Sequence, residues 1–222
     1  LYTFNGNGPE DRFGTSVSGA GDVNADGFDD VIIGAPSGVG SNATGYAKVY
    51  SGDDGALLFT HYGHNQSHAF GASVSGGYDL NGDGFDDYAV GAPCDDHNGS
   101  DSGSVRVISG SDGFELYTFY GDSVGDSFGG TVSVSDDVNN DGYAELIVGA
   151  RFDDNTGADS GSVRVCFSVP IPRTIPCDSD IDHSGATDVD DLNIILSDWA
   201  TSCPETFWHL PSVVIHPGGI LI

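Results

Sequence analysis

Short carboxylates and amides recur in this 222-residue chain at the spacing of a metal-binding turn. Counted from Asp22, the first loop has oxygen-bearing side chains at positions 1, 3, 5 and 9, glycine at position 6 and an available backbone carbonyl at position 7. Hard oxygen donors at alternating positions suit Ca²⁺ and not a soft metal, and the glycine permits a sharp turn. The pattern therefore predicts a Ca²⁺ site.

Two further loops repeat this pattern, with the position-7 residue expected to bind through its carbonyl. The predicted ligands are Asp22, Asn24, Asp26, Phe28 and Asp30, then Asp79, Asn81, Asp83, Phe85 and Asp87, then Asp137, Asn139, Asp141, Tyr143 and Glu145. Glu145 is longer than the aspartates at its position, so the third site is expected to be looser. The alternative is three acidic turns without metal, whose carboxylates would repel one another.

A fourth loop near the C-terminus has EF-hand-like spacing with aspartate at the closing position. Its predicted ligands are Asp180, Asp182, Ser184, Ala186, Asp188 and Asp191. Apolar residues at helical spacing follow, from Leu192 to Trp199, which predicts a short amphipathic helix. Cys177 and Cys203 bracket the segment and are predicted to form a disulfide, because so small a module has little core of its own. The four loops together predict four Ca²⁺ sites.

The charge of the chain excludes several classes of partner. There are 34 acidic and 6 basic residues, a formal charge of −28, and the acids are 30 Asp and only 4 Glu. Nucleic acids and anionic membranes need a basic face, so neither is expected as a partner. No apolar run reaches the ~18 residues needed to span a bilayer. Four cysteines and the absence of a leader are expected of a mature protein from an oxidising compartment.

Three internal repeats define the expected architecture. Phe13-Gly14, Phe70-Gly71 and Phe128-Gly129 recur at spacings of 57 and 58 residues, and the metal-type loops recur with them. Each repeat contains short alternating segments separated by Gly and Asp turns, including residues 46–51, 57–62, 104–109, 115–120 and 162–167. Four short strands per unit, used in tandem, are typical of propeller blades.

The Phe-Gly start, the D-x-N-x-D-G-x-x-D loop and the Gly-Ala-Pro finish resemble the FG-GAP repeats of the integrin α-subunit propeller and of secreted bacterial proteins. The resemblance covers residues 1–168 and implies that the Asp-rich loops are calcium-binding hairpins. The integrin propeller has seven repeats, whereas three are present here. Residues 177–204 resemble one half of a dockerin, which implies a cohesin-type partner. Dockerins have two such loops, so a calcium-stapled structural cap is the alternative.

The resulting fold class is mostly β, with three four-stranded FG-GAP blades forming an incomplete propeller and a small EF-hand-like loop–helix module. The expected boundaries are 1–168 for the repeats (1–56, 57–115 and 116–168), 169–176 for a proline-rich linker, 177–204 for the calcium module and 205–222 for an apolar tail that is a possible assembly strand.

No catalytic constellation emerges from the sequence, so an enzyme is not expected. Ser123 and Ser127 fit G-x-S-x-G but precede a repeat strand with no following helix. His61, His64 and His68 are close in sequence, but a solvated loop is favoured over a zinc site. The aspartates at 95, 96, 101, 153, 154 and 159 are interpreted as solvated turns in preference to extra metal sites. Asn42, Asn65 and Asn98 begin N-x-[ST] triplets and are candidate glycan acceptors.

The two ends of the repeat region suggest how the protein works. Residues 1–4 match residues 116–119, the last strand of repeat two, whereas repeat three lacks that strand. The expected function is that of a secreted, calcium-stabilised structural or adhesive subunit on a bacterial surface or appendage, assembling head to tail into a filament. The alternative is a fragment of an adhesin that binds a protein or carbohydrate.

Overall fold

The computed structural model describes residues 1–37, 44–66, 68–140, 143–167, 215–216 and 219–220. The chain divides into two compact units, Leu1–Ile171 and Pro172–Ile222. The predicted linker, the predicted EF-hand-like loop and helix, and Cys177 and Cys203 lie outside the described residues.

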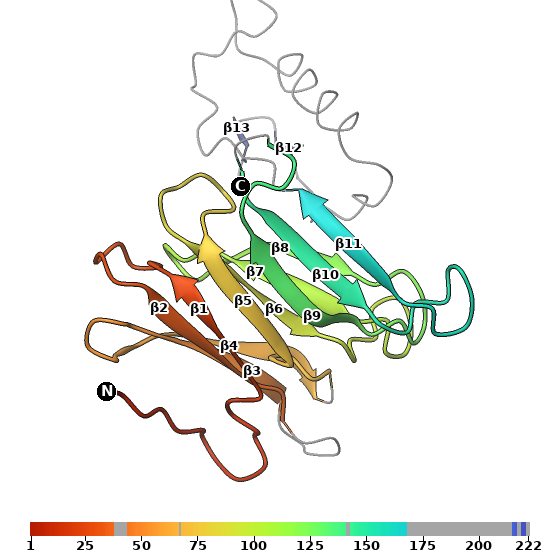
Figure 1. Cartoon of the computed structure of the whole chain (residues 1–222), viewed down its shortest axis with the longest axis horizontal. Coiled ribbons are helices and arrows are strands. Elements are labelled where there is room, and N and C mark those ends of the chain that lie inside the picture. Colours follow the sequence, from red (N-terminus) through yellow and green to blue (C-terminus); the bar gives the residue numbers. More distant parts are fainter. Residues whose placement is uncertain (38–43, 67, 141–142, 168–214, 217–218, 221–222) are drawn as a thin grey trace, which may run out of the picture. The chain divides into compact units, whose positions relative to one another are not determined.

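The first unit contains three antiparallel sheets (Figure 1). The first sheet comprises β1 (Ser16–Gly21), β2 (Asp30–Ala35), β3 (Thr44–Tyr50) and β4 (Leu57–Gln66), hydrogen-bonded in that order. The second comprises β5 (Ser73–Tyr78), β6 (Asp87–Ala92), β7 (Ser104–Ile108) and β8 (Glu115–Tyr120). The third comprises β9 (Phe128–Ser135), β10 (Glu145–Ala150) and β11 (Ser162–Phe167). In the second unit, β12 (Ile215–His216) pairs with β13 (Gly219–Ile220).

These three sheets confirm the predicted mostly β fold with propeller-type blades. The segments 115–120 and 162–167 are strands with the predicted bounds. In the described residues the third sheet has three strands, so β11 forms its edge there. Residues 1–4, which match an outer strand in sequence, are not in a strand in this structure. The reason is physical, because a strand needs a neighbouring edge to satisfy its backbone groups.

Successive blades pack face to face through apolar residues. The second strand of each blade is largely buried, and in β6 every residue is buried. One apolar cluster lies between the first two blades and includes Ile32, Val49 and Val74. A second lies between the second and third blades and includes Val105 and Leu146. Strands buried on both faces explain the continuous apolar runs in the central segments of each repeat.

The blades also meet through glycine at each junction. A Cβ atom on Gly34 would lie 2.1 Å from the carbonyl oxygen of Gly71, and one on Gly91 would lie 2.1 Å from the carbonyl oxygen of Gly129. The Ser16 hydroxyl donates to the same Gly71 oxygen at 2.9 Å, and the Ser73 hydroxyl donates to the Gly129 oxygen at 2.7 Å. Only glycine permits this backbone approach, so the glycine of each Gly-Ala-Pro element is a docking position for the next blade.

Residues 1–4 pack on the first blade although they form no strand. The Phe4 ring stacks on Tyr50 with a centroid distance of 4.1 Å, and the Tyr2 hydroxyl donates to the Asp53 carbonyl at 2.5 Å. Tyr2 lies against Gly55 as Phe59 of β4 lies against Gly113 of the second blade. The segment therefore occupies on the first blade the place that β4 occupies on the second.

Candidate metal centres

The β1–β2 loop forms the turn that the first predicted site requires. The Asp22 carboxylate accepts hydrogen bonds from the backbone N–H groups of Asp26 and Gly27, at 3.0 and 2.9 Å. The Asn24 side-chain oxygen also accepts from the Asp26 N–H, at 2.9 Å. Gly27 has a φ of +91°, in the left-handed region that favours glycine. Three oxygen-bearing side chains are thus held around one tight turn.

The β5–β6 loop repeats this arrangement. The Asp79 carboxylate accepts from the N–H groups of Gly82 and Gly84 at 2.6 and 2.7 Å. Asp83 accepts from the Phe85 N–H at 3.0 Å and from the Ser111 hydroxyl at 3.0 Å. In the corresponding third loop, Asp137, Asn139, Tyr143 and Glu145 are described, whereas Asp141 lies outside the described residues.

The carboxylate at position 9 of each loop also has a structural role that the sequence did not reveal. Asp30 accepts from the Val23 N–H in its own loop and from the Gly52 N–H after β3, both at 3.0 Å. Asp87 makes the matching bonds to Leu80 at 2.9 Å and Gly110 at 3.0 Å. Burial raises the pKa of Asp30, and burial together with nearby Asp83 and Asp79 raises the pKa of Asp87 to about 7. These carboxylates tie the loop to the end of the third strand.

Two predicted ligand atoms are buried acceptors without a donor. Among the described residues, nothing donates a hydrogen bond to Asn81 Oδ1, at position 3 of the second loop, or to Glu145 Oε1, at position 9 of the third. Their residues are 5% and 0% exposed. Leaving such an atom unsatisfied costs about 1–3 kcal/mol. Oxygen donors of this kind, in loops of this composition, fit a hard cation such as Ca²⁺.

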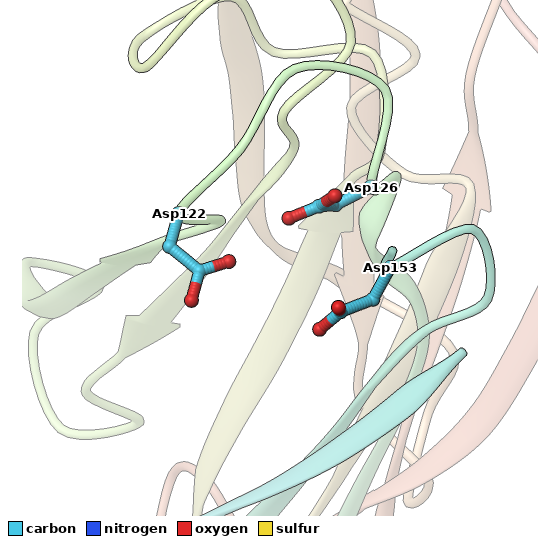
Figure 2. A group of neighbouring side chains, drawn as sticks. All are labelled: Asp122, Asp126 and Asp153. Carbon is cyan, nitrogen blue, oxygen red and sulfur yellow. The ribbon is translucent and has the colours of Figure 1, made fainter. Parts of the chain in front are cut away.

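A second acidic cluster joins the second and third blades. Asp122, Asp126 and Asp153 offer carboxylate oxygens that all lie within 4.8 Å of one another (Figure 2), the one such group of His, Cys, Asp or Glu in the described part of the chain. Asp122 follows β8, Asp126 precedes β9, and Asp153 follows β10. Asp153 was predicted to be a solvated turn residue, but it is buried, with 3% of its surface exposed. Asp154 and Asp159 are exposed, as predicted.

Hydrogen bonds and one cation stabilise this cluster. Asp153 accepts from the Ser162 hydroxyl and from Asn155, and these bonds, with the Ser162 bond first, lower its pKa. Asp126 is 2% exposed and accepts from the Ser123 N–H at 3.0 Å. Burial, followed by a hydrogen bond shared with Asp122, raises the pKa of Asp126 to about 6. The guanidinium of Arg164 lies 3.2 Å from Asp122.

The repeat spacing relates this cluster to equivalent positions in the other blades. Asp11, His68 and Asp126 are equivalent, as are Asn7, His64 and Asp122. The cations of the third strands are equivalent as well. Lys48 lies over Phe13 at 5.8 Å, Arg106 over Phe70 at 4.3 Å and Arg164 over Phe128 at 4.7 Å, measured to the ring centroid. This 57- and 58-residue register is the sequence signal that could have located the cluster.

The three histidines do not converge on one metal site in the described residues. His61 Nε2 lies 2.8 Å from the Tyr88 hydroxyl between two blades, and burial lowers the His61 pKa to about 4. His68 Nδ1 lies 3.4 Å from Asp95. His61 and His64 both lie in β4, so the interpretation as a loop was wrong for them, although His64 is exposed as expected of a solvated residue.

The remaining candidates from the sequence have these positions. Asn98 Nδ2, the atom to which a glycan would be attached, donates to the Gly121 carbonyl at 2.7 Å. Asn65 is exposed at the end of β4, and Asn42 lies outside the described residues. Within the described residues Cys94 and Cys166 form no disulfide, and burial raises the pKa of each thiol to about 11.

With this geometry in place, comparison with known proteins identifies the repeats. The FG-GAP repeat model matches residues 13–50, 70–108 and 128–166, more than half of the chain. The chain belongs to the FG-GAP repeat family. Each match begins at the Phe of an FG pair, includes one Asp-rich loop and covers the first three strands of one blade.

Curated proteins similar to this FG-GAP chain include several integrin α subunits. Integrin alpha pat-2 of Caenorhabditis briggsae is 44% identical over 89 residues, 36% of this chain and 7% of that protein. Integrin alpha-V of Gallus gallus is 27% identical over 197 residues, 80% of this chain and 19% of that protein. Integrin alpha-PS3 of Drosophila melanogaster is 39% identical over 95 residues, 37% of this chain and 8% of that protein. The chain thus spans less than a fifth of the length of these relatives.

Proposed function

We propose that this FG-GAP protein is a calcium-stabilised, extracellular adhesion module that binds a protein or carbohydrate ligand. Its family and its similarity to integrin α subunits support an adhesive function. An extracellular location agrees with loops suited to Ca²⁺. In the part of the chain that the structure describes, no helix is long and apolar enough to cross a membrane. The buried, donorless oxygens of Asn81 and Glu145 are the observation that carries the calcium part.

The calcium sites comprise the oxygen-bearing side chains and position-7 carbonyls of the three blade loops. Bound Ca²⁺ would supply positive charge that offsets the repulsion between the aspartates of each loop. The chain's own residues preorganise the turn, because Asp22 and Asp79 hold the loop backbone through hydrogen bonds. Glu145 in the third loop supplies a longer arm and a buried oxygen.

The C-terminal segment is included in this proposal on its sequence alone. The EF-hand-like spacing from Asp180 to Asp191 supports a fourth Ca²⁺ site, and Cys177 and Cys203 support a disulfide that closes the module. The module then acts as a structural cap or binds a cohesin-type partner. Peptide mapping of unreduced protein should give a linked Cys177–Cys203 peptide, and alkylation of Cys177 before reduction would refute the pairing.

A ligand array tests the adhesive function directly. The full chain, labelled at its amino terminus, is applied to arrayed glycans and extracellular-matrix proteins in Ca²⁺ and in EDTA. We expect binding to a restricted set of spots that is lost in EDTA. Binding to no spot in Ca²⁺, by protein that melts cooperatively in the same buffer, would count against an adhesion module.

Head-to-tail assembly into a filament is the second candidate function. It is favoured by β11, which is the edge of its sheet in the described residues, whereas β3 and β7 each pair with a fourth strand. Residues 1–4, equivalent in sequence to part of β8, are the segment that would lie beside β11 of another copy. Deleting residues 1–5 should abolish assembly and leave Ca²⁺ binding intact. Unchanged assembly would exclude this contact.

A further inference from the structure

The third blade exposes apolar residues that the other two blades bury. Val163 and Val165 of β11 are 68% and 40% exposed. By repeat register they are equivalent to Ala47 and Val49 in the first blade, which are both 0% exposed, and to Val105 and Val107 in the second, which are 0% and 2% exposed. In the first two blades these positions belong to the apolar clusters that pack against the next blade. The third blade therefore presents a docking face of the same kind.

A groove on this blade corresponds to the glycine docking position. It has a volume of about 530 Å³ and is lined by Thr131, Gly149, Ser162, Val163 and neighbouring residues. Gly149 is equivalent to Gly34 and Gly91, each of which lies against the carbonyl of the next blade's FG glycine. Thr131 is equivalent to Ser16 and Ser73, whose hydroxyls donate to that carbonyl. The groove thus has the donor and the backbone space for another FG glycine.

The first blade exposes the matching surface at its opposite face. Val17 of β1 is 66% exposed, whereas its equivalent Val74 is 7% exposed and packs against the preceding blade. A Cβ on Gly14 would meet no atom within 4 Å, whereas its equivalents Gly71 and Gly129 lie against carbonyls of Tyr46 and Ser104. By the same register, the partner carbonyl for Gly14 would be that of Ser162, which lines the groove.

We propose that the third-blade groove takes the first blade of a second copy, so that two chains close into one six-bladed ring. The proposal rests on the head-to-tail contact of the second candidate function. It differs in the assembly that this contact forms, which is a closed dimer and not a filament. Propellers contain typically 4–8 blades, and two is the one number of three-bladed copies that falls in this range. Two-fold symmetry makes both junctions identical and closes the assembly, whereas a contact that did not close would give a filament.

Residues 1–4 fit the same junction. β4 is the outer strand of the first blade and also packs on the second blade. Residues 1–4 pack on the first blade in the same way. In the ring, the preceding blade is the third blade of the other copy, so these residues lie beside its β11 edge. Face packing and completion of the sheet therefore occur at one junction.

The test measures the mass of the full chain in solution by light scattering after size exclusion, over a range of concentrations in Ca²⁺ and ~0.15 M salt, which screens the repulsion between two acidic chains. We expect a species of twice the 22.9 kDa chain mass. Val163→Glu and Val17→Glu should each raise the dimer dissociation constant by roughly 100-fold or more, because each would bury a carboxylate at the junction. Val124→Glu is the matched control, since Val124 is also 66% exposed but lies in the β8–β9 loop against Gly99 of the second blade, and should leave the dimer unchanged.

Each other outcome overturns the ring in a recognisable way. A parent that remains monomeric at every concentration refutes both the ring and the head-to-tail contact. Larger, open-ended species that Val163→Glu and Val17→Glu abolish refute the ring and retain the head-to-tail contact. Dimers that both variants leave intact refute this junction. Calcium-dependent melting of each variant verifies folding, and ligand binding on the array reports separately on the adhesive function.

Discussion

At the level of single residues, the buried carboxylates differ in what satisfies their oxygens. Asp30 and Asp87 each accept hydrogen bonds from two backbone N–H groups and so connect a loop to the end of a strand. Asp126 instead lies beside two other carboxylates and has one backbone donor, Ser123. Burial, followed by the hydrogen bond shared with Asp122, raises the pKa of Asp126.

Replacement of Asp126 by asparagine should stabilise the protein at neutral pH. The folded pKa of about 6 exceeds the reference value of 3.8, so the stability linked to this group is fully present below pH 3.8 and is lost as pH rises through 6. The amide that replaces the carboxylate has no such charge, and its oxygen still accepts from Ser123. We expect a gain of about 1–2 kcal/mol at pH 7.5 and little change at pH 4, measured by urea unfolding. A variant that is less stable at pH 7.5 would show that the Asp126 charge is compensated.

At the level of elements, the metal-type loops combine a preorganised turn with a donorless oxygen. In the second loop this atom is Asn81 Oδ1, which costs stability unless a cation binds it. The calcium dependence of stability should therefore be concentrated in ligand atoms, such as Asn81 Oδ1, that have no other partner in the described residues.

Asn81→Ala should have opposite effects with and without Ca²⁺. In EDTA the variant should be as stable as the parent or more stable, because the unsatisfied acceptor is gone. In Ca²⁺ it should be less stable by about 1–3 kcal/mol, because a ligand is lost. Thermal melting in both buffers checks this, with Asn65→Ala at an exposed position as the control. Equal destabilisation in both buffers would mean that Asn81 is structural and not a ligand.

Strands and loops could be predicted from the sequence where the residues of a single repeat determine them. Residues 115–120 and 162–167 alternate in character and became β8 and β11 with those bounds. Residues 1–4 have the same pattern as part of β8 but formed no strand, because strand formation depends on a partner edge that the pattern does not contain. The cluster of Asp122, Asp126 and Asp153 was missed because its members come from different loops and meet only when two blades pack.

At the level of the whole molecule, net charge makes cation binding a global contribution to stability. The chain has a formal charge of −28, so every bound Ca²⁺ relieves self-repulsion as well as local repulsion in its loop. If Ca²⁺ is ~10-fold above its dissociation constant, each site contributes about 1.4 kcal/mol by linkage.

Removal of calcium should therefore lower the melting temperature by several degrees. Scanning calorimetry in excess EDTA should show this drop, and added Ca²⁺ should restore the parent value. Mg²⁺ should restore it poorly, because Mg²⁺ requires a near-octahedral site with short bonds. An identical melting curve in EDTA and Ca²⁺ would refute calcium stabilisation of the fold.

The position of residues 1–4 indicates that the chain can be cut between two blades without the blades separating. These residues lie on the first blade through the Phe4–Tyr50 stack and the Tyr2–Asp53 hydrogen bond, without a described strand before them in the sheet. Side-chain contacts of this kind hold an outer segment on the following blade, so the peptide link from β4 to β5 is not what keeps those blades together. A single cleavage between residues 65 and 66, at the exposed end of β4, should yield two fragments that co-elute under native conditions and separate only on denaturation. The blade boundary is thus a place where the chain tolerates a break, and where circularly permuted or split forms of the protein can be made.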